Sequence, residues 1–320
     1  MRAEFDPVGR FLGELETDGA PETGAATYLK LMADVPKLTA KAAEELQSAG
    51  QCAIRLKKLN TEIDERRRQI NRLIAGSNLA RSAATWLSRP LDAARAAAGG
   101  EVCACLNRMW EPVYKKFQTT FEQAYPFNRS AENEAPRAEV AGFFGSTGGI
   151  FAFDESEGAP ARAEGISMSG DYMQAISVAE QLRLAMPGGH LSVAFTITAS
   201  SRNVTGLRMV RFEYGSSRFD YAMGQDESRN FRWPTPGADQ AALSIEPING
   251  ALYANPKRFV GEWALMRLFD EATPSGSTMA WSFPASGQTL VARFDLSGSG
   301  AEFIRSGHFS RFRCPPRVCP

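Results

Sequence analysis

The sequence predicts an α+β protein, in which an N-terminal all-α helical region is followed by an antiparallel β-sandwich of Greek-key type with one inserted helix. The first observation is a change of period: apolar residues recur at helical spacing and then alternate with polar ones, as in LSVAFTITAS (191–200). The second is a series of short strands, separated by Gly, Pro, Asn and Asp, which favours a sandwich over a parallel sheet. We therefore expect a boundary near 187–190, with a helical region over 1–135, short helices and loops over 136–189, and the β-sandwich over 190–320.

The helical region begins with two predicted helical runs. Residues 25–49 are rich in Ala, Leu, Lys and Glu, which favour helix, and Pro36 is expected to divide that run or to begin its second helix. Residues 53–75 have an amphipathic pattern, and the helix is expected to end at Gly76. The apolar stripe of this second run comprises Ile54, Leu59, Ile63, Ile70, Leu73 and Ile74.

Two further helices are predicted before the chain reaches residue 125. One covers about 79–97 with an interruption at Pro90, and the glycine pair at 99–100 separates it from the other, which covers 101–124 and has Trp110 on its apolar face.

The linking segment is expected to contain a helix at 136–144 and another at 170–186. The acidic and Gly-rich stretch 154–168 between them is predicted to be a loop.

The predicted strands share an alternating pattern and turn residues at their ends, and they cover 191–200, 206–215, 217–223, 230–234, 241–248, 278–284 and 289–296. One helix, PKRFVGEWALMRLFDEA (256–272), is predicted to interrupt them and to bury the Trp263 face against the sheets. Trp233 and Trp281 are expected to be core residues.

Composition argues against several classes of partner and segment. Lys plus Arg and Asp plus Glu number 36 each, and a net charge of zero gives no general reason to expect nucleic acid or an anionic membrane as a partner. No run approaches the ~20 apolar residues of a membrane-spanning helix, and the N-terminus lacks the apolar core of a signal peptide. We therefore expect no membrane span, and export would need a signal from elsewhere.

Five cysteines cannot all pair within one chain. Cys314 and Cys319, in CPPRVC, are close enough for a small disulfide loop, whereas Cys103 and Cys105 are expected to face apart on their helix. The fifth cysteine is Cys52. We expect these cysteines to be structural, either free or partly paired, and not to form a zinc site; no metal or cofactor is expected.

No motif for nucleotide, metal or nucleophile chemistry is found. GSTGGI (145–150) lacks the lysine of a phosphate loop, and the patterns HExxH, GxSxG and CxxC are missing. We expect no catalytic residues. The alternative, a hydrolase that uses Asp154, Glu155 or His308, requires a buried cleft that gathers them.

The helix over 53–75 carries a local excess of positive charge. Between residues 55 and 72 it has seven Lys and Arg against three acidic residues, which could suit nucleic acid or a lipid surface. We favour a solvated face supported by pairs four residues apart, Glu62–Arg66 and Asp64–Arg68.

Four motifs, in order, resemble the C-terminal region of the IcmF/TssM family of type VI secretion systems. They are a Trp-bearing helix that leads into Tyr-Pro-Phe and a Phe-Phe-Gly helix end, the FRWP strand end (231–234), the helix GEWALMRLFDEA (261–272), and the terminal FRCP (312–315). The agreement covers about 100–320, and residues 1–100 carry no motif. The motif residues are Trp110, Tyr125, Pro126, Phe127, Trp233, Pro234, Gly261, Trp263, Arg267, Cys314 and Pro315.

The resemblance implies a structural role outside the cytoplasm. Members of the family are inner-membrane-anchored, and their periplasmic C-terminal part binds the outer-membrane lipoprotein TssJ, largely through the β-domain, together with other membrane-complex subunits. The spans and the cytoplasmic domain of those longer chains are not in this sequence, so we expect an excised C-terminal part or a short relative.

Each motif also has a plain physical interpretation. The rings of Tyr125 and Phe127 are expected to pack back on Phe117 and Phe121 after the helix stops, and the guanidinium of Arg267 to hold a carboxylate or strand carbonyls. A rival function is a peptidoglycan- or glycan-binding module, which a strip of exposed aromatic side chains on one sheet would favour.

Overall fold

The computed structural model describes residues 25–37, 40, 51–75, 81–145, 149–200, 206–222 and 226–320. Most of the second part of the predicted 25–49 run, the helix end at Gly76 and residues 146–148 of the GSTGGI loop lie outside these residues. The chain divides into two units, each discontinuous in sequence. The helical unit comprises Met1–Pro112, Phe153–Tyr172 and Pro316–Pro320, and the β unit comprises Val113–Ala152 and Met173–Pro315.

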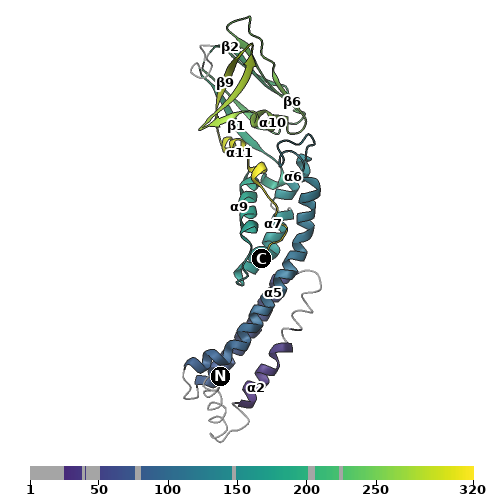
Figure 1. Cartoon of the computed structure of the whole chain (residues 1–320), viewed down its shortest axis with the longest axis vertical. Coiled ribbons are helices and arrows are strands. Elements are labelled where there is room, and N and C mark those ends of the chain that lie inside the picture. The colour runs from purple at the N-terminus through teal and green to yellow at the C-terminus, as the bar shows by residue number, and fades with distance from the viewer. Residues whose placement is uncertain are drawn as a thin grey trace. The chain divides into compact units, whose positions relative to one another are not determined.

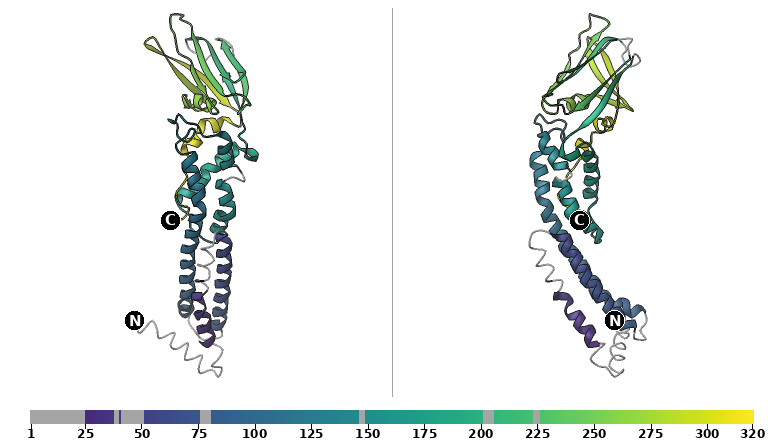
Figure 2. Two further views of the ribbon diagram at one scale, coloured as in Figure 1. Left: turned by 90° about the vertical axis from the view of Figure 1, so that its right-hand side faces the viewer. Right: turned by 180° about the vertical axis from the view of Figure 1, so that it is seen from behind.

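The helical unit is built on α2 (Ala25–Ala33), α4 (Cys52–Ala75) and the first part of α5 (Arg81–Thr120), which run side by side (Figure 2). Their shared core contains most of the stripe predicted for 53–75, and the Tyr28 hydroxyl donates a hydrogen bond of 3.3 Å to the carbonyl of Leu87. Ile54 departs from the prediction because its side chain is 60% exposed. The core residues are Tyr28, Val35, Leu59, Ile63, Ile70, Leu87, Leu91, Ala94 and Ala98.

Helix α5 corrects the prediction of two helices, because it continues for 40 residues through Pro90, the glycine pair at 99–100 and Pro112. Each internal proline loses one backbone hydrogen bond, a cost of about 3 kcal/mol, and each glycine costs about 1 kcal/mol. Burial of Leu91 and Trp110, each completely, provides compensating packing. Tertiary contacts therefore override the local preference for a break.

The stretch 154–168 is also helical at its start, contrary to the predicted loop. Helix α7 (Gly149–Phe153) continues into a π-helical turn, η1 (Asp154–Gly158), and then α8 (Ala159–Ala163). This polar segment can form helix inside the protein because its carboxylates find hydrogen-bond partners within the helical unit, as described below. The flanking helices α6 (Arg137–Phe144) and α9 (Gly170–Leu184) form where they were predicted, and a 3₁₀ turn, η2 (Pro187–Gly189), follows α9.

The β unit contains two antiparallel sheets, which confirms the predicted α+β class (Figure 1). One sheet has the order β4-β1-β9-β8-β7 and the other the order β3-β2-β5-β6. The strands with these labels are β1 (Val193–Ala199), β2 (Leu207–Tyr214), β3 (Ser217–Ala222), β4 (Glu227–Trp233), β5 (Gln240–Pro247), β6 (Lys257–Val260), β7 (Thr273–Ser275), β8 (Thr278–Ala285) and β9 (Gln288–Ser297). Two short helices, α11 (Ala301–Ser306) and α12 (His308–Arg311), follow the last strand.

The helix predicted over 256–272 is only α10 (Ala264–Asp270); the start of that segment forms the edge strand β6, and the edge strand β7 follows its end. β6 pairs with β5 in one sheet, and β7 pairs with β8 in the other. Helix α10 therefore connects the two sheets, and its Phe269 ring lies 5.7 Å from Phe195 of the first sheet and 6.2 Å from Phe212 of the second. Helical spacing of apolar residues extended the prediction too far because β6 is itself partly buried at alternate residues.

Candidate functional site

The tryptophan, tyrosine and arginine motifs of the β unit converge on the start of α10. The Trp263 indole donates a hydrogen bond of 2.6 Å to the carbonyl of Ala135. Its ring lies 5.3 Å from the ring of Trp233 and 6.3 Å from that of Tyr125, and all three side chains are buried. We name this site the Trp263 junction; it comprises Tyr125, Glu134, Trp233, Gly261, Trp263, Arg267 and Asp270.

Arg267 ties α10 to the loop that precedes α6. Its Nε donates to Glu134 Oε1 at 2.9 Å, and one terminal nitrogen donates to the carbonyl of Ala131 at 3.0 Å. The guanidinium also lies over the Tyr125 ring, 4.1 Å from its centroid, a cation–π contact. Arg267 thus holds a carboxylate as predicted, but the carbonyls that it holds belong to a loop and not to a strand.

A second ion pair closes the junction at the other end of α10. The Tyr125 hydroxyl donates to Asp270 Oδ2 at 2.8 Å, and Arg129 lies 3.2 Å from the same carboxylate. Burial raises the pKa of Asp270, and the Tyr125 hydrogen bond, Arg129 and Arg267 oppose that rise only in part. Burial, with the neighbouring Asp270 charge, also raises the pKa of Tyr125.

Gly261 explains why the motif begins with glycine. Its φ of 115° is a conformation that other residues avoid, and a Cβ there would lie 2.8 Å from the carboxylate carbon of Glu134. The neighbouring Glu262 accepts a hydrogen bond of 2.8 Å from the backbone N–H of Arg137, at the start of α6. The backbone of this segment therefore approaches the 125–137 region closely.

Phe127 packs back on the preceding helix as predicted, whereas Tyr125 turns to the junction. The Phe127 ring lies 5.3 Å from Phe117 and 5.6 Å from Phe121, and Phe312 joins the same cluster at 5.1 Å from Phe117. Cys314 and Pro315 follow Phe312 in buried positions. The peptide bonds before Pro126 and Pro234 are both cis.

Trp110, by contrast, belongs to the helical unit and does not take part in the junction. It is completely buried, with ring centroids 5.0 Å from Phe153 and 5.4 Å from Tyr172.

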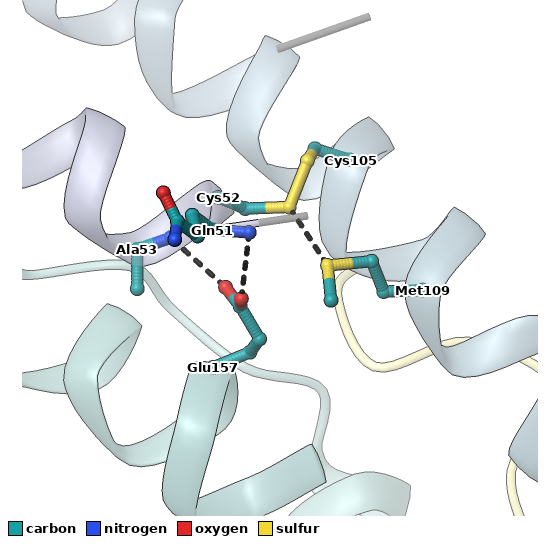
Figure 3. Close-up of a disulfide and its surroundings, with 6 residues drawn as sticks. All are labelled: Gln51, Cys52, Ala53, Cys105, Met109 and Glu157. Atoms are coloured by element: carbon teal, nitrogen blue, oxygen red, sulfur yellow. Dashed lines mark hydrogen bonds between the residues drawn. A yellow bond between two sulfur atoms is a disulfide. The ribbon is translucent and has the colours of Figure 1, made fainter. Parts of the chain in front are cut away.

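Two disulfides link other parts of the helical unit to α5, at positions two residues apart. Cys52, at the start of α4, pairs with Cys105, and Cys319, near the C-terminus, pairs with Cys103 (Figure 3 shows the first). The Cα–Cα distances are 6.0 and 5.6 Å, respectively. Cys103 and Cys105 do face apart, as helix geometry requires.

The small Cys314–Cys319 loop that spacing allowed does not form, because Cys319 is committed to Cys103 and Cys314 is a buried free thiol. Burial raises the pKa of the Cys314 thiol.

Glu157 has a structural role that the sequence did not indicate. Its buried carboxylate accepts one hydrogen bond from the N–H of Gln51 and one from the N–H of Ala53, each 3.0 Å, at the start of α4 (Figure 3). A carboxylate at a helix N-terminus satisfies orphan donors and complements the helix dipole. Beside it, the Met109 sulfur lies 3.3 Å from Cys52 Sγ. Helical structure over 154–158 would have been the signal for this role, because an acidic residue in a predicted loop is expected to be solvated.

The hydrolase alternative finds little support in these positions. Asp154 is occupied by Arg162, at 2.7 and 3.1 Å, and by the Tyr172 hydroxyl at 2.6 Å, while Glu155 is exposed. His308 belongs to the β unit, and burial, reinforced by Arg311, lowers its pKa.

The outward faces of the two sheets are polar among the strand residues that the structure describes. Hydroxyl pairs cross neighbouring strands, with Thr196 donating to Asn230 at 2.7 Å and Thr198 lying 2.9 Å from Ser228. No aromatic side chain in these described strands faces outward, so the strip that would favour glycan binding is not formed.

Three exposed apolar side chains of the β unit lie within a short stretch of sequence, on β6 and in the loop before it. Ile248, Tyr253 and Val260 are 55%, 73% and 68% exposed, respectively. A cavity of about 210 Å³ lies elsewhere in the unit, lined by Leu184, Phe303 and His308 among others. Loops at one end of a sandwich commonly carry binding residues, and among the described residues the β5–β6 loop carries two large, exposed apolar side chains, Ile248 and Tyr253.

Comparison with known proteins matches the strand-bearing part of the β unit to a family. Residues 193–313 match the model of the Type VI secretion protein IcmF C2-like domain. No curated protein sequence matches the chain. Among the described helices, none is both long and apolar enough to cross a membrane.

Three solved structures share the fold. The C-terminal domain of the type VI secretion protein TssM from EAEC is 18% identical, with a TM-score of 0.56 over 68% of this chain and 98% of that domain. A chain of a type VI secretion system membrane core complex is 16% identical, with a TM-score of 0.69 over 98% of this chain and 70% of that one. A chain of a type VI membrane complex, of which this chain spans 58%, is 16% identical with a TM-score of 0.66 over 89% of this chain. Residues 193–313 thus belong to the IcmF C2-like domain family, and the chain as a whole shares the fold of these type VI secretion structures.

Proposed function

We propose that this chain is a scaffolding part of a type VI secretion membrane core complex and acts by binding, not by catalysis. The observation that carries the proposal is the IcmF C2-like match over residues 193–313, supported by a fold likeness that extends over 98% of the chain. The Trp263 junction fits this role, since its buried rings and ion pairs hold loop and sheet in one arrangement.

A periplasmic location is part of the proposal. Disulfides persist in oxidising compartments such as the bacterial periplasm and are rare in the cytosol. Four of the five cysteines of this chain are paired, by Cys52–Cys105 and Cys103–Cys319. Alkylation of free thiols in intact cells, followed by mass spectrometry, would test the location: blocked Cys52 or Cys319 in most molecules would contradict it.

The proposed partner is the outer-membrane lipoprotein TssJ of the same secretion system, bound through the β-sandwich of residues 190–320. The β5–β6 loop and β6 are the proposed contact segments, because an exposed tyrosine beside exposed aliphatic side chains is typical of interface anchors.

Titration of the purified chain with a soluble form of TssJ tests this partner. We expect saturable binding, and we expect Tyr253→Ala to weaken it at least ~10-fold, the loss typical of an anchor residue. Ile54→Ala, which changes an apolar side chain of the helical unit that is also mostly exposed, is the control and should leave the affinity unchanged. Absence of binding by the unmodified chain would remove the partner, whereas binding insensitive to Tyr253→Ala would remove only the proposed contact segment.

A further inference from the structure

The pairing of the cysteines does not follow their order along the chain. The order is Cys52, Cys103, Cys105, Cys314 and Cys319, and the two disulfides interleave, with Cys314 left free. Cys319 pairs with a residue 216 positions away, although another cysteine lies only five positions away (319 − 314). The native bond is therefore one that an unfolded chain finds far less readily than the Cys314–Cys319 bond.

Loop-closure entropy gives the size of this bias. The probability that two residues of a flexible chain meet falls with about the 3/2 power of their separation, so closure over five residues is favoured over closure over 216 by about 300-fold. In the unfolded chain, Cys319 therefore meets Cys314 long before it meets Cys103. No such bias separates Cys105 from Cys103 as partners of Cys52, since those two loops differ by two residues.

We propose that Cys314 is a temporary disulfide partner of Cys319 during oxidative folding and passes it to Cys103 when the helical unit forms. In the first step, a disulfide oxidant accepts two electrons and two protons from the thiols of Cys314 and Cys319 and is reduced to two thiols. In the second step, the Cys103 thiolate attacks Cys319 Sγ, so that the Cys103–Cys319 bond forms as the Cys314–Cys319 bond breaks. Cys314 leaves as a thiolate and takes up a proton, and this exchange is redox-neutral.

Contacts of the native helical unit favour the transfer. The Asn107 side-chain oxygen accepts hydrogen bonds from the N–H groups of Val318, at 2.9 Å, and Cys319, at 3.2 Å, one turn along α5 from Cys103. The carbonyl of Val318 accepts a further bond of 2.8 Å from Ser169. These bonds hold Cys319 beside Cys103 once the helices are in place.

The released thiol is poorly placed to reverse the exchange. Cys314 is 9% exposed, and its burial raises its pKa, which reduces the population of the thiolate that would attack the new bond.

A quenched refolding experiment on the full chain tests the proposal. The reduced, unfolded chain would be mixed with oxidised glutathione, trapped at intervals with an alkylating agent, and mapped by mass spectrometry. We expect the Cys314–Cys319 bond to appear first and to decay as the Cys103–Cys319 bond grows. A time course in which Cys314–Cys319 never appears, or in which it persists as the final bond, would overturn the proposal.

The variant Cys103→Ser removes the acceptor. Here we expect Cys314–Cys319 to become the end product while Cys52–Cys105 still forms, and the latter bond reports that α4 has reached α5. If Cys52–Cys105 forms but Cys319 is recovered as an alkylated free thiol, Cys314 and Cys319 do not pair and the proposal is wrong. Cys314→Ser removes the temporary partner, so the Cys103–Cys319 bond should form several-fold more slowly than in the unmodified chain; formation at an equal or higher rate would show that the Cys314–Cys319 bond does not lead to it.

Discussion

At the scale of single residues, the Trp263 junction depends on polar groups of Glu134, Trp263 and Arg267 that find partners in the interior. Arg267, Glu134 and the Ala131 carbonyl satisfy one another, and the Trp263 indole has its own acceptor. Buried donors and acceptors that lose their partners cost about 1–3 kcal/mol each, so the junction tolerates few substitutions. Sequence reasoning identified Arg267 as a residue that holds a carboxylate, but it could not identify Glu134 as the carboxylate.

Gly261→Ala should destabilise the β unit by about 3 kcal/mol or more. The added methyl group meets the Glu134 carboxylate, and the backbone φ of 115° strains any residue with a Cβ. Gly237→Ala is the matched control: its φ is also positive, at 73°, but the space around it is open, and the expected loss is about 1–2 kcal/mol. Chemical denaturation followed by tryptophan fluorescence measures both, and equal losses would show that the contact with Glu134 is unimportant.

Asp270 should make stability depend on pH in the direction opposite to a typical exposed carboxylate. Its folded-state pKa is raised above the unfolded value, mainly by burial, so its contribution is fully present below about pH 3.9 and is lost as the pH rises through the folded pKa. The melting temperature of the wild type minus that of Asp270→Asn should therefore decrease between about pH 4 and 7. A difference that increases over this window would show that the Asp270 pKa is lowered in the folded protein.

At the scale of elements, tertiary packing explains the places where the structure differs from the local sequence preference. Helix α5 passes through Pro90 because Leu91 and its neighbours are buried against α2 and α4. The 256–272 segment divides because its start completes a sheet as β6, a role that depends on pairing with β5 and that the local sequence does not specify. Alternation along β1, β2 and β5 predicted those strands within a few residues, since each has one buried face.

The turn η1 should anchor the start of α4 through Glu157. Glu157→Gln keeps the shape but replaces one acceptor by a donor that faces a backbone N–H, and we expect a loss of about 1–3 kcal/mol. The control Glu101→Gln alters an exposed carboxylate on α5 of the same helical unit and should change stability by less than about 0.5 kcal/mol. Thermal unfolding followed by circular dichroism provides the comparison; indistinguishable variants would remove Glu157 as an anchor.

At the scale of the whole molecule, the sequence predicted the fold class and the family but not the organisation of the helical unit. Each motif, such as GEWALMRLF, can be identified from a few consecutive residues, and four motifs in order were enough to indicate the resemblance to the family. The pairing of Cys52 with Cys105 depends on how α4 meets α5, which periodicity does not specify. The division into segments at 135 and 189 stays a prediction, since the two units are each assembled from separated stretches.

The interleaved disulfides also determine how the chain would carry a mechanical load. A pull applied at residue 51 and at residue 320 passes from Cys52 to Cys105, through Ala104 to Cys103, and then to Cys319. This covalent route bypasses residues 53–102 and 106–318, so the whole β unit would feel no tension between those two points. Reduction would return every bypassed residue to the stretched path, and the extended length in a force measurement would increase accordingly.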